Sequence, residues 1–519
     1  MKPHWVALCV AAVAIAACSS RAPVASPSPV PAIDTADASP PPFVAPSTAP
    51  LGARQALSRL IDSLVAQPVY RNAHWGILIV DAANADTLYS LNAGKLFIPG
   101  SNMKIVTGAV ALAKPGPDFR FRTSVAARGA IRQGTLVGDL LVIGRGDPSF
   151  SRRFYDSDVA PLAAIADSLS ARGITRITGR VLAGGDAFSD APHGFGWSWD
   201  DLGEGYGAGV DELMIAEGAV EVMISGGRRV GDTATYAITP ELGYPLVRAR
   251  VRTAVRDTAS TNGASESLIV RRDSAGGRVL IEGEIGIGET RTLDIAFPDQ
   301  RAAFLAALRR ALLARRIAVS NTVPRDTSAA PDTLFTFLSP PLRDLVPAME
   351  KPSLNQMAEA IFKVVGLELR GEGTAAAARR AVDTTLLEWG ASPDGFVVRD
   401  GSGLSRYNYL SPETLVRVLD RMRRDTIFEM WRTSLPAAGR EGTLTNRMRG
   451  TPAEGVVNAK TGFVTGARSL SGYAPAGDGR LLIFSLICNN WTVPVREVES
   501  VQDAIVTHLV TLQLGSARP

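Results

Sequence analysis

The sequence is poor in the residues on which several enzyme classes depend. Among its 519 residues are four histidines and three cysteines. It contains no His-x-x-x-His pair, no Cys-x-x-Cys pair and no Gly-x-Ser-x-Gly elbow. These absences weigh against a zinc enzyme and against a Ser-His-Asp hydrolase. A hydrolase with this sequence would have to deprotonate its nucleophile without histidine, and we expect neither a metal nor a cofactor.

Positive charge is neither dominant nor gathered into runs. Lys and Arg together number 55 and Asp and Glu 51, which leaves a net charge of +4. A protein that follows a phosphate backbone needs a basic stripe, so nucleic acid is excluded as a partner. Only seven of the basic residues are lysine. Because arginine supplies most of the positive charge, each lysine is a candidate for a special role.

The chain begins with an apolar run that is too short to cross a membrane permanently. Residues 5–17 follow a charged start, whereas a spanning helix needs roughly 20 apolar residues. We therefore predict that residues 1–18 are a bacterial export signal. Its last four residues, Ile15-Ala16-Ala17-Cys18, resemble a lipobox, in which lipid on Cys18 would anchor the protein at a membrane surface. The alternative is an ordinary signal peptide with a coincidental cysteine.

Residues 19–50 are expected to form a disordered linker. Nine of these 32 residues are proline, and most others are small or polar. Such a segment cannot bury enough apolar surface to fold. It would act as a semi-extended spacer between the membrane and the globular body.

The two ends of the body carry the patterns of one α+β domain. Helical spacing at 53–66 is followed by strand-like runs at 75–80 and 87–91. Near the C-terminus, strand-like runs at 455–462, 468–473 and 481–488 precede a helical pattern at 493–512. These segments predict an antiparallel five-stranded sheet that is built from both ends of the chain and covered by helices.

The region between these ends has a different composition. From about residue 123 to residue 328 the chain consists of short β-branched runs, many glycines and clusters of turn residues. Because this region interrupts a domain whose first and last parts must pair, we expect it to form one or two inserted β-rich domains.

A serine and a lysine three residues apart offer a catalytic pair without histidine. In Ser101-Asn102-Met103-Lys104 the two side chains would share one face of a helix, which brings the amine within reach of the hydroxyl. Free backbone N–H groups at the helix start could stabilise an oxyanion. An ammonium is a poor base, so Lys104 must be neutral at rest. This requires burial and a nearby cation that lowers its pKa, a role open to Lys460.

Two further segments supply groups that such a pair needs. Ser353-Leu354-Asn355 opens a predicted helix, where the serine hydroxyl can relay a proton and the asparagine carboxamide can hold a substrate backbone. Lys460-Thr461-Gly462 lies on a predicted strand, where the lysine and the threonine can meet a substrate carboxylate and the glycine allows close approach.

Together these segments resemble one known family. The chain is similar to the D-alanyl-D-alanine carboxypeptidase/endopeptidases of the class C low-molecular-mass penicillin-binding proteins, peptidase family S13, from about residue 53 to the C-terminus. The segments that carry the resemblance are PGSNMKIVTGAVAL, LVGDLLVIGRGDPSF, GWSWDDLGEGYGAG, KPSLNQMAEAIFK, VRDGSGLSRYNYLSPETLVRVL, SLPAAGREGTLTNRMRGT and AKTGFVTGARSLSGY. The separation of 252 positions from Ser101 to Ser353 fits a member of this family with inserted domains.

The resemblance implies a fold and an organisation of the chain. The fold is that of a penicilloyl-serine transferase, β-lactamase/transpeptidase-like, with helices on both faces of the sheet. The expected parts are a signal and lipobox (1–18), a linker (19–50), transpeptidase-like parts 1 (51–122) and 2 (330–519), inserted domain II (123–142 and 205–329) and inserted domain III (143–204).

The resemblance also implies roles for the motif residues. They are Ser101 as the acylated nucleophile, Lys104 as its base, Ser353 and Lys460 as the proton relay, and Asn355, Thr461 and Gly462 as substrate-holding groups. The backbone N–H groups of Ser101 and Phe463 would form the oxyanion hole. Phe463 departs from the family pattern, in which a threonine hydroxyl helps to bind the terminal carboxylate. A pocket for the amino and carboxyl end of diaminopimelate would map onto Trp197, Asp200 and Arg406, although a structural turn and a core salt bridge are equally open readings.

The expected function is therefore that of a serine hydrolase of peptidoglycan. It would cleave D-Ala–D-Ala ends or D-Ala–diaminopimelate cross-bridges in the periplasm and would be acylated by β-lactams. One rival is a β-lactamase or esterase on the same core, against which no Glu-x-x-Leu-Asn segment follows Ser353. The other rival is a catalytically weak wall-binding scaffold. The sequence leaves open the balance between carboxypeptidase and endopeptidase activity and the formation of a homodimer.

Overall fold

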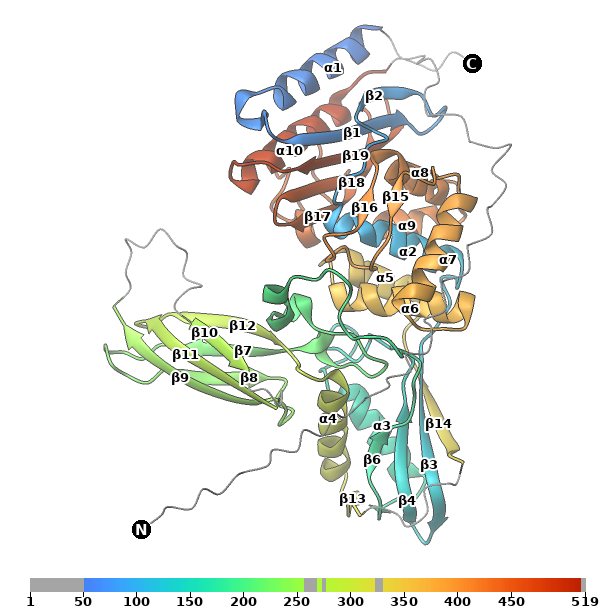
Figure 1. The fold of residues 1–519 in the computed structure, drawn as a ribbon, viewed down its shortest axis with the longest axis vertical. Helices are drawn as coiled ribbons and strands as arrows, with labels where there is room; N and C mark the ends of the chain where they lie inside the picture. Colours follow the sequence, from blue (N-terminus) through green and yellow to red (C-terminus); the bar gives the residue numbers. More distant parts are fainter. Residues whose placement is uncertain (1–50, 256–267, 273–276, 323–329, 515–519) are drawn as a thin grey trace, which may run out of the picture. The chain divides into compact units, whose positions relative to one another are not determined.

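The computed structural model describes residues 51–255, 268–272, 277–322 and 330–514 (Figure 1). The predicted signal, Cys18 and the linker lie outside the described residues. No helix in the described ranges is both long and apolar enough to span a bilayer.

The central sheet has five strands drawn from the two ends of the body. Their order is β17-β18-β19-β1-β2, and every neighbouring pair is antiparallel. The strands are β1 (His74–Asp81), β2 (Thr87–Leu91), β17 (Asn458–Val464), β18 (Ala467–Pro475) and β19 (Leu481–Asn489). This arrangement confirms the sheet predicted from the sequence, although β17 begins three residues later than expected.

Both faces of this sheet are covered, because its middle strands are apolar at successive positions. In β1, Ile77 and Ile79 belong to one apolar cluster and Leu78 and Val80 to another, as the alternation of side chains along a strand requires. The first cluster includes side chains of α1 (Leu51–Val65) and α10 (Val495–Thr511). The second includes those of α2 (Met103–Ala113) and α8 (Pro412–Arg423).

Helix α2 is buried on all sides, which positions the catalytic motif at its start. Every residue from Met103 to Leu112 is buried, and a helix that is apolar all round must lie inside the core. Helices α5 to α8 contact it. The remaining elements of this part are α5 (Leu342–Glu350), α6 (Asn355–Arg370), α7 (Ala375–Glu388), α9 (Phe428–Ser434), β15 (Phe396–Val397) and β16 (Tyr409–Leu410).

The inserted region contains three more sheets. One has the order β13-β5-β4-β3-β14, with β6 paired to β4, and two three-stranded sheets have the orders β10-β11-β9 and β12-β7-β8. Its strands are β3 (Arg122–Arg132), β4 (Thr135–Ile143), β5 (Arg176–Ile177), β6 (Val181–Ala183), β7 (Ala219–Ser225), β8 (Thr235–Thr239), β9 (Leu246–Ala254), β10 (Leu268–Arg272), β11 (Arg278–Gly286), β12 (Thr290–Ala296), β13 (Ala318–Val319) and β14 (Asp332–Leu338).

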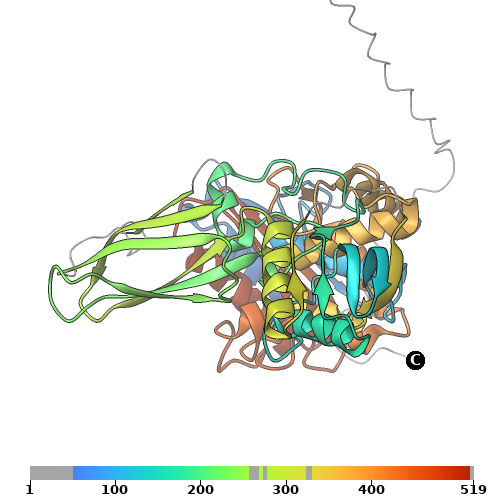
Figure 2. The same cartoon turned by 90° about the horizontal axis from the view of Figure 1, so that it is seen from below.

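Two helices also lie in this region, α3 (Ala160–Ala171) and α4 (Gln300–Ala314), and they pack against each other (Figures 1 and 2). Because β4 runs parallel to β5 and β6, their connection must cross over, and α3 makes that crossover. The domain limits given above remain a prediction. Strand pairing crosses these limits in more than one place, since β5 and β6 share a sheet with β3 and β4, and β14 pairs with β3.

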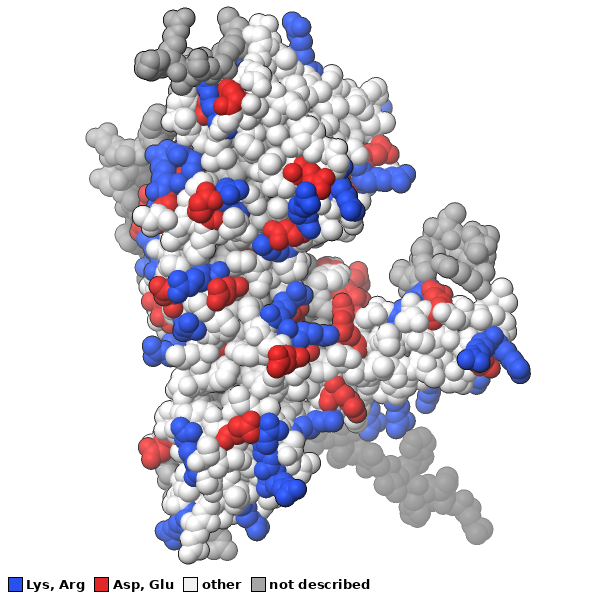
Figure 3. Space-filling view, turned by 180° about the vertical axis from the view of Figure 1, so that it is seen from behind, with Lys and Arg blue, Asp and Glu red and all other residues white. Residues whose placement is uncertain are grey.

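Charges of the two signs are interspersed on one face of the molecule. On the face in Figure 3, Lys and Arg side chains alternate with Asp and Glu and form no continuous basic stripe. This face therefore offers no track for a phosphate backbone.

Candidate active site

Ser101 and Lys104 meet at the start of the buried helix α2. Ser101 lies in the single 3-10 turn Gly100–Asn102 that leads into α2. Ser101 is half-buried, whereas Lys104 is fully buried. The Lys104 Nζ atom lies 3.0 Å from Ser101 Oγ. The structure thus brings the predicted nucleophile and base together.

The other neighbours of Lys104 determine where its lone pair points. Its amine donates to Asn355 Oδ1 at 2.7 Å and to the Ser402 carbonyl at 2.7 Å. Both oxygens can only accept hydrogen bonds. A neutral amine has two protons and one lone pair, so these two acceptors take both protons. The lone pair is left facing the Ser101 hydroxyl, which is the arrangement that a general base needs.

Burial is the main reason why Lys104 can lose its proton. Desolvation lowers the pKa of Lys104 from its usual 10.5 to about 8, while Glu350, Asp400 and Glu359 oppose the shift. Lys460 was expected to supply a lowering charge, and the two amines do disfavour each other's protonated form. Burial, and then the charge of Lys104, lowers the pKa of Lys460 to about 7.

Ser353 and Lys460 form a second hydroxyl–amine pair beside the first. Lys460 Nζ donates to Ser353 Oγ at 2.8 Å and to the Thr461 carbonyl at 3.1 Å. Ser353 has a left-handed backbone, with a φ of 68°, a conformation that is costly for a residue with a side chain. Asn102 connects the two pairs, because its side chain donates to the Lys460 carbonyl at 2.7 Å.

Asn355 is held from both sides. Its Oδ1 accepts from Lys104, and its Nδ2 donates to the Tyr206 carbonyl at 2.9 Å. Tyr206 comes from the inserted part of the chain, so this part contacts the catalytic centre directly. The orientation of the carboxamide is fixed by these two contacts.

The predicted strand motif borders the serine as expected. The turn that carries Ser101 packs against β17. Gly462 permits this approach, since a Cβ atom there would lie 2.3 Å from the Pro99 carbonyl and 2.2 Å from Ser469 Oγ. Thr461 is buried, and its hydroxyl donates to Thr443 Oγ1 at 2.7 Å. Phe463 is 51% exposed.

A cavity of about 760 Å³ opens over these residues. Its walls include Ser101, Ser353, Asn355, Thr461, Phe463, Asp200, Arg406 and Arg468. Asp200 and Arg406, predicted to recognise diaminopimelate, are both exposed and lie in these walls. Trp197 is not among the lining residues. Its indole N–H donates to Asp400 Oδ2 at 2.9 Å, which connects the inserted part to the turn below the site.

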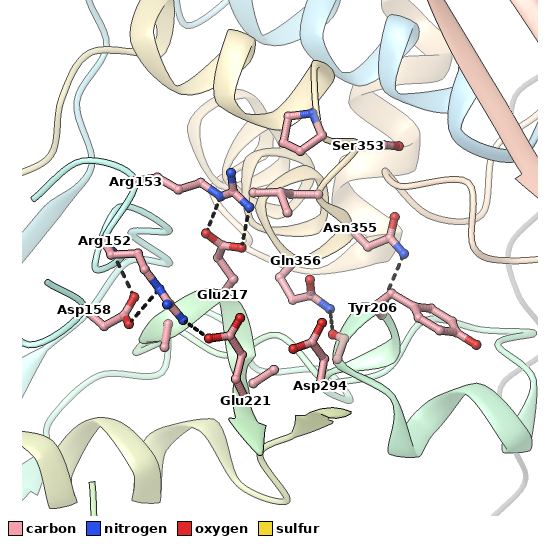
Figure 4. A pocket seen from close by; sticks show the side chains of 15 residues that line it. Arg152, Arg153, Asp158, Tyr206, Glu217, Glu221, Asp294, Ser353, Asn355 and Gln356 are labelled. Atoms are coloured by element: carbon pink, nitrogen blue, oxygen red, sulfur yellow. Dashed lines mark hydrogen bonds and ion pairs between the residues drawn. The ribbon is translucent and has the colours of Figure 1, made fainter. Parts of the chain in front are cut away.

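A second cavity of about 480 Å³ lies beside the first (Figure 4). Three residues line both cavities, namely Tyr206, Ser353 and Asn355. On the far side of the second cavity Arg152 pairs with Glu221 at 2.8 Å and Arg153 pairs with Glu217. Ser353 and Asn355 of the catalytic centre therefore border both cavities.

Three contributors to the site were not identified from the sequence. The Ser402 carbonyl belongs to the turn at residues 400–403, to which no catalytic role was assigned from the sequence. Glu359 accepts hydrogen bonds from the backbone N–H groups of Gly401 and Ser402, at 3.0 and 2.7 Å, and so fixes that turn. The sequence signal for this role was that Glu359 lies four residues after Asn355 on α6, which places both side chains on the same face of the helix. Glu350 is fully buried, and burial raises its pKa to about 7.

The described residues contain no group of three or more histidine, cysteine, aspartate or glutamate side chains that could hold a metal ion.

Comparisons with known proteins agree with this geometry. The model of the D-Ala-D-Ala carboxypeptidase 3 (S13) family matches residues 57–512. A D-alanyl-D-alanine carboxypeptidase of Actinomadura sp. (strain R39) is 32% identical over 466 residues, which cover 86% of this chain and 83% of the relative. The D-alanyl-D-alanine carboxypeptidase DacB of Haemophilus influenzae is 23% identical, with coverage of 82% and 88%.

The fold has a solved counterpart. A crystal structure of penicillin binding protein 4 from Haemophilus influenzae superposes with a TM-score of 0.74 at 24% identity, covering 88% of this chain and 99% of that one. At this identity the likeness establishes the fold alone.

Proposed function

The chain belongs to the D-Ala-D-Ala carboxypeptidase 3 (S13) family, and from this premise we propose that Ser101 is the nucleophile with which it cleaves peptidoglycan peptides. The protein is a serine hydrolase of the D-Ala-D-Ala carboxypeptidase and endopeptidase type and binds penicillin. The observation that carries the assignment to Ser101 is the 3.0 Å distance from Lys104 Nζ to Ser101 Oγ, together with the two acceptors that take the other hydrogen bonds of the amine.

In the acylation step, the Ser101 proton passes to Lys104 Nζ as Ser101 Oγ attacks the carbonyl carbon of the penultimate D-Ala. The oxyanion is stabilised by the backbone N–H groups of Ser101 and Phe463. The C–N bond to the last residue then breaks. Water later attacks the ester, which returns the serine and releases the shortened peptide.

The leaving amine needs a proton before it departs. Lys460 and Ser353 are placed to deliver it, because Lys460 Nζ donates to Ser353 Oγ at 2.8 Å. A hydroxyl can accept one proton and pass on another without carrying a full charge. Lys460 thus loses one proton while Lys104 holds the one from Ser101. When water attacks the ester, Lys104 returns its proton to Ser101, and the proton of the water restores Lys460.

Asp200 and Arg406 are proposed to bind the free end of a diaminopimelate side chain. They carry opposite charges and line the cavity that contains Ser101. A carboxylate suits the substrate's ammonium, and a guanidinium fork suits its carboxylate. Trp197 would act on this pocket only through Asp400, to which it is hydrogen-bonded.

Penicillin labelling tests the nucleophile. The full chain, incubated with a fluorescent penicillin, is expected to form an adduct that survives denaturing electrophoresis and maps by peptide mass to Ser101. Ser101→Ala should abolish the label, whereas Ser500→Ala, at an exposed position of α10, should keep it. Absence of an adduct on the unmodified protein would contradict the assignment and favour a wall-binding scaffold. Rapid release of hydrolysed drug would favour a β-lactamase.

We also propose that the protein is exported to the periplasm and tethered by lipid on Cys18. The tetrad Ile15-Ala16-Ala17-Cys18 and the proline-rich spacer after it support this location. Expressed in a bacterial host, the full chain is expected in the membrane fraction, and Cys18→Ala should move it to the soluble periplasmic fraction. Cys9→Ala is the matched control, because Cys9 lies in the part that is removed. Equal partitioning of all three proteins would contradict a lipid anchor.

A further inference from the structure

The wall of the active-site cavity contains an unusual pair of neighbours on β17 and β18. Phe463 and Arg468 are directly opposite each other in the antiparallel register, so their side chains lie on the same face of the sheet. The Arg468 guanidinium lies over the Phe463 ring, with Cζ 5.7 Å from the ring centre. Both residues line the cavity that contains Ser101 and Thr461.

Arg468 is held in place by a carboxylate behind it. Its guanidinium forms an ion pair with Glu499 of α10, and its side chain is 12% exposed. A guanidinium has five N–H donors. The one hydrogen bond recorded for it is to Glu499, and its Nε has no partner among the described residues. Glu499 therefore fixes the guanidinium in position, and it engages only part of the five N–H donors.

The charge of Arg468 persists at neutral pH. Burial, and then the nearby charge of Arg447, lowers its pKa to about 10. The Phe463 ring covers one side of the guanidinium, a contact that favours a planar cation. Cation, aromatic ring and carboxylate support together form a rigid site for an anionic group.

We propose that Arg468 determines specificity for the terminal carboxylate of the substrate, together with Thr461. Phe463 positions the guanidinium and takes the place of a threonine whose hydroxyl would otherwise contribute. The inference rests on the proposed function, and it adds the residue that distinguishes a free peptide end from a blocked one. A peptide with a free carboxylate would bind across the Thr461 hydroxyl and the Arg468 guanidinium, and a C-terminal amide would lose the charged contact.

The test compares two substrates in one protein. The full chain is given a peptide that ends in D-Ala-D-Ala with a free carboxylate and the same peptide as its C-terminal carboxamide, and kcat and KM are measured for each. In Arg468→Gln the ratio of kcat/KM for the acid to that for the amide should fall on the order of 10- to 100-fold, chiefly through KM for the acid. The amide should change little.

Arg447→Gln is the matched control. Arg447 is similarly buried, is paired with Asp503 of the same helix α10 and does not line the cavity. This substitution should leave the ratio unchanged. Because Arg468→Gln leaves Glu499 unpaired, the double variant Arg468→Gln/Glu499→Gln is measured as well, and the same fall in the ratio is expected. Adding Phe463→Thr to it should restore part of the lost preference for the acid.

Each outcome bears on the inference. An unchanged acid-to-amide ratio in both Arg468 variants would overturn it while leaving the proposed function intact. Equal loss for acid and amide would also overturn it, because that pattern indicates a structural role. If the unmodified protein cleaves neither peptide and forms no penicillin adduct, the proposed function falls and the inference falls with it.

Discussion

Replacing Lys104 with methionine is expected to slow the acylation of Ser101 by penicillin about 100- to 10,000-fold, the usual contribution of a general base. Methionine approximates the length of the side chain and fills the buried site, but it has no lone pair to take the proton of Ser101. The rate constant of adduct formation, measured by stopped reaction and gel fluorescence, checks this. Lys114→Met, at an exposed ion pair with Glu388, is the control and should react normally.

The pH profile provides a second reading of the same prediction. A base works only when unprotonated, and burial brings the pKa of Lys104 down to about 8. The acylation rate of the unmodified protein should therefore rise as pH increases through about 8, and Lys104→Met should lose this rise. If Lys104→Met reacts at the normal rate, or if its rate still rises with pH, Lys104 is not the general base.

Gly403→Ala is expected to produce the largest loss of stability that a single added methyl group causes near the site. Gly403 has a φ of 85°, and a Cβ atom there would lie 1.9 Å from the carbonyl oxygen of Gly100. The left-handed backbone costs roughly 1–2 kcal/mol, and overpacking costs about 1–3 kcal/mol more. We expect the free energy of unfolding, measured with urea, to fall by about 2–5 kcal/mol. Acylation should slow too, because Gly100 precedes Ser101.

Gly371→Ala separates the two causes. Gly371 ends α6 with a φ of 78°, and a Cβ atom there would meet nothing within 4 Å. Only the backbone cost of roughly 1–2 kcal/mol should appear, with normal acylation. If the free energy of unfolding fell equally in the two alanine variants, the close approach of Gly403 to Gly100 would contribute nothing to the cost of Gly403→Ala.

The part of the site that local geometry alone could predict is the pair whose members are neighbours along the chain, whereas the pairing of Ser353 with Lys460 was expected from the family resemblance. Ser101 and Lys104 are one helical turn apart, so local geometry alone places the amine at the hydroxyl. The strands at both ends were predictable for a related reason, since their apolar runs are long and bounded by turn residues. Neither prediction required knowledge of distant contacts.

What could not be predicted are the groups brought in by folding. The Ser402 carbonyl is a backbone atom of an ordinary-looking turn, and no side chain marks its role. Glu350 could not be distinguished by its type from the acidic residues of the surface. Trp197 was assigned to a pocket, and the structure places its indole on Asp400. In each case the deciding partner lies far away in sequence, so no local pattern records it.

The pairing of β1 with β19, from His74↔Asn489 to Asp81↔Leu482, also sets the time at which the enzyme becomes reactive. A ribosome releases Ser101 and Lys104 long before Asn355, Ser402 and Lys460. Until those residues arrive, Lys104 remains in water and keeps its proton, so the serine is chemically quiet. A chain that ends before these residues therefore has no neutral amine beside Ser101 to start an attack on a peptide bond.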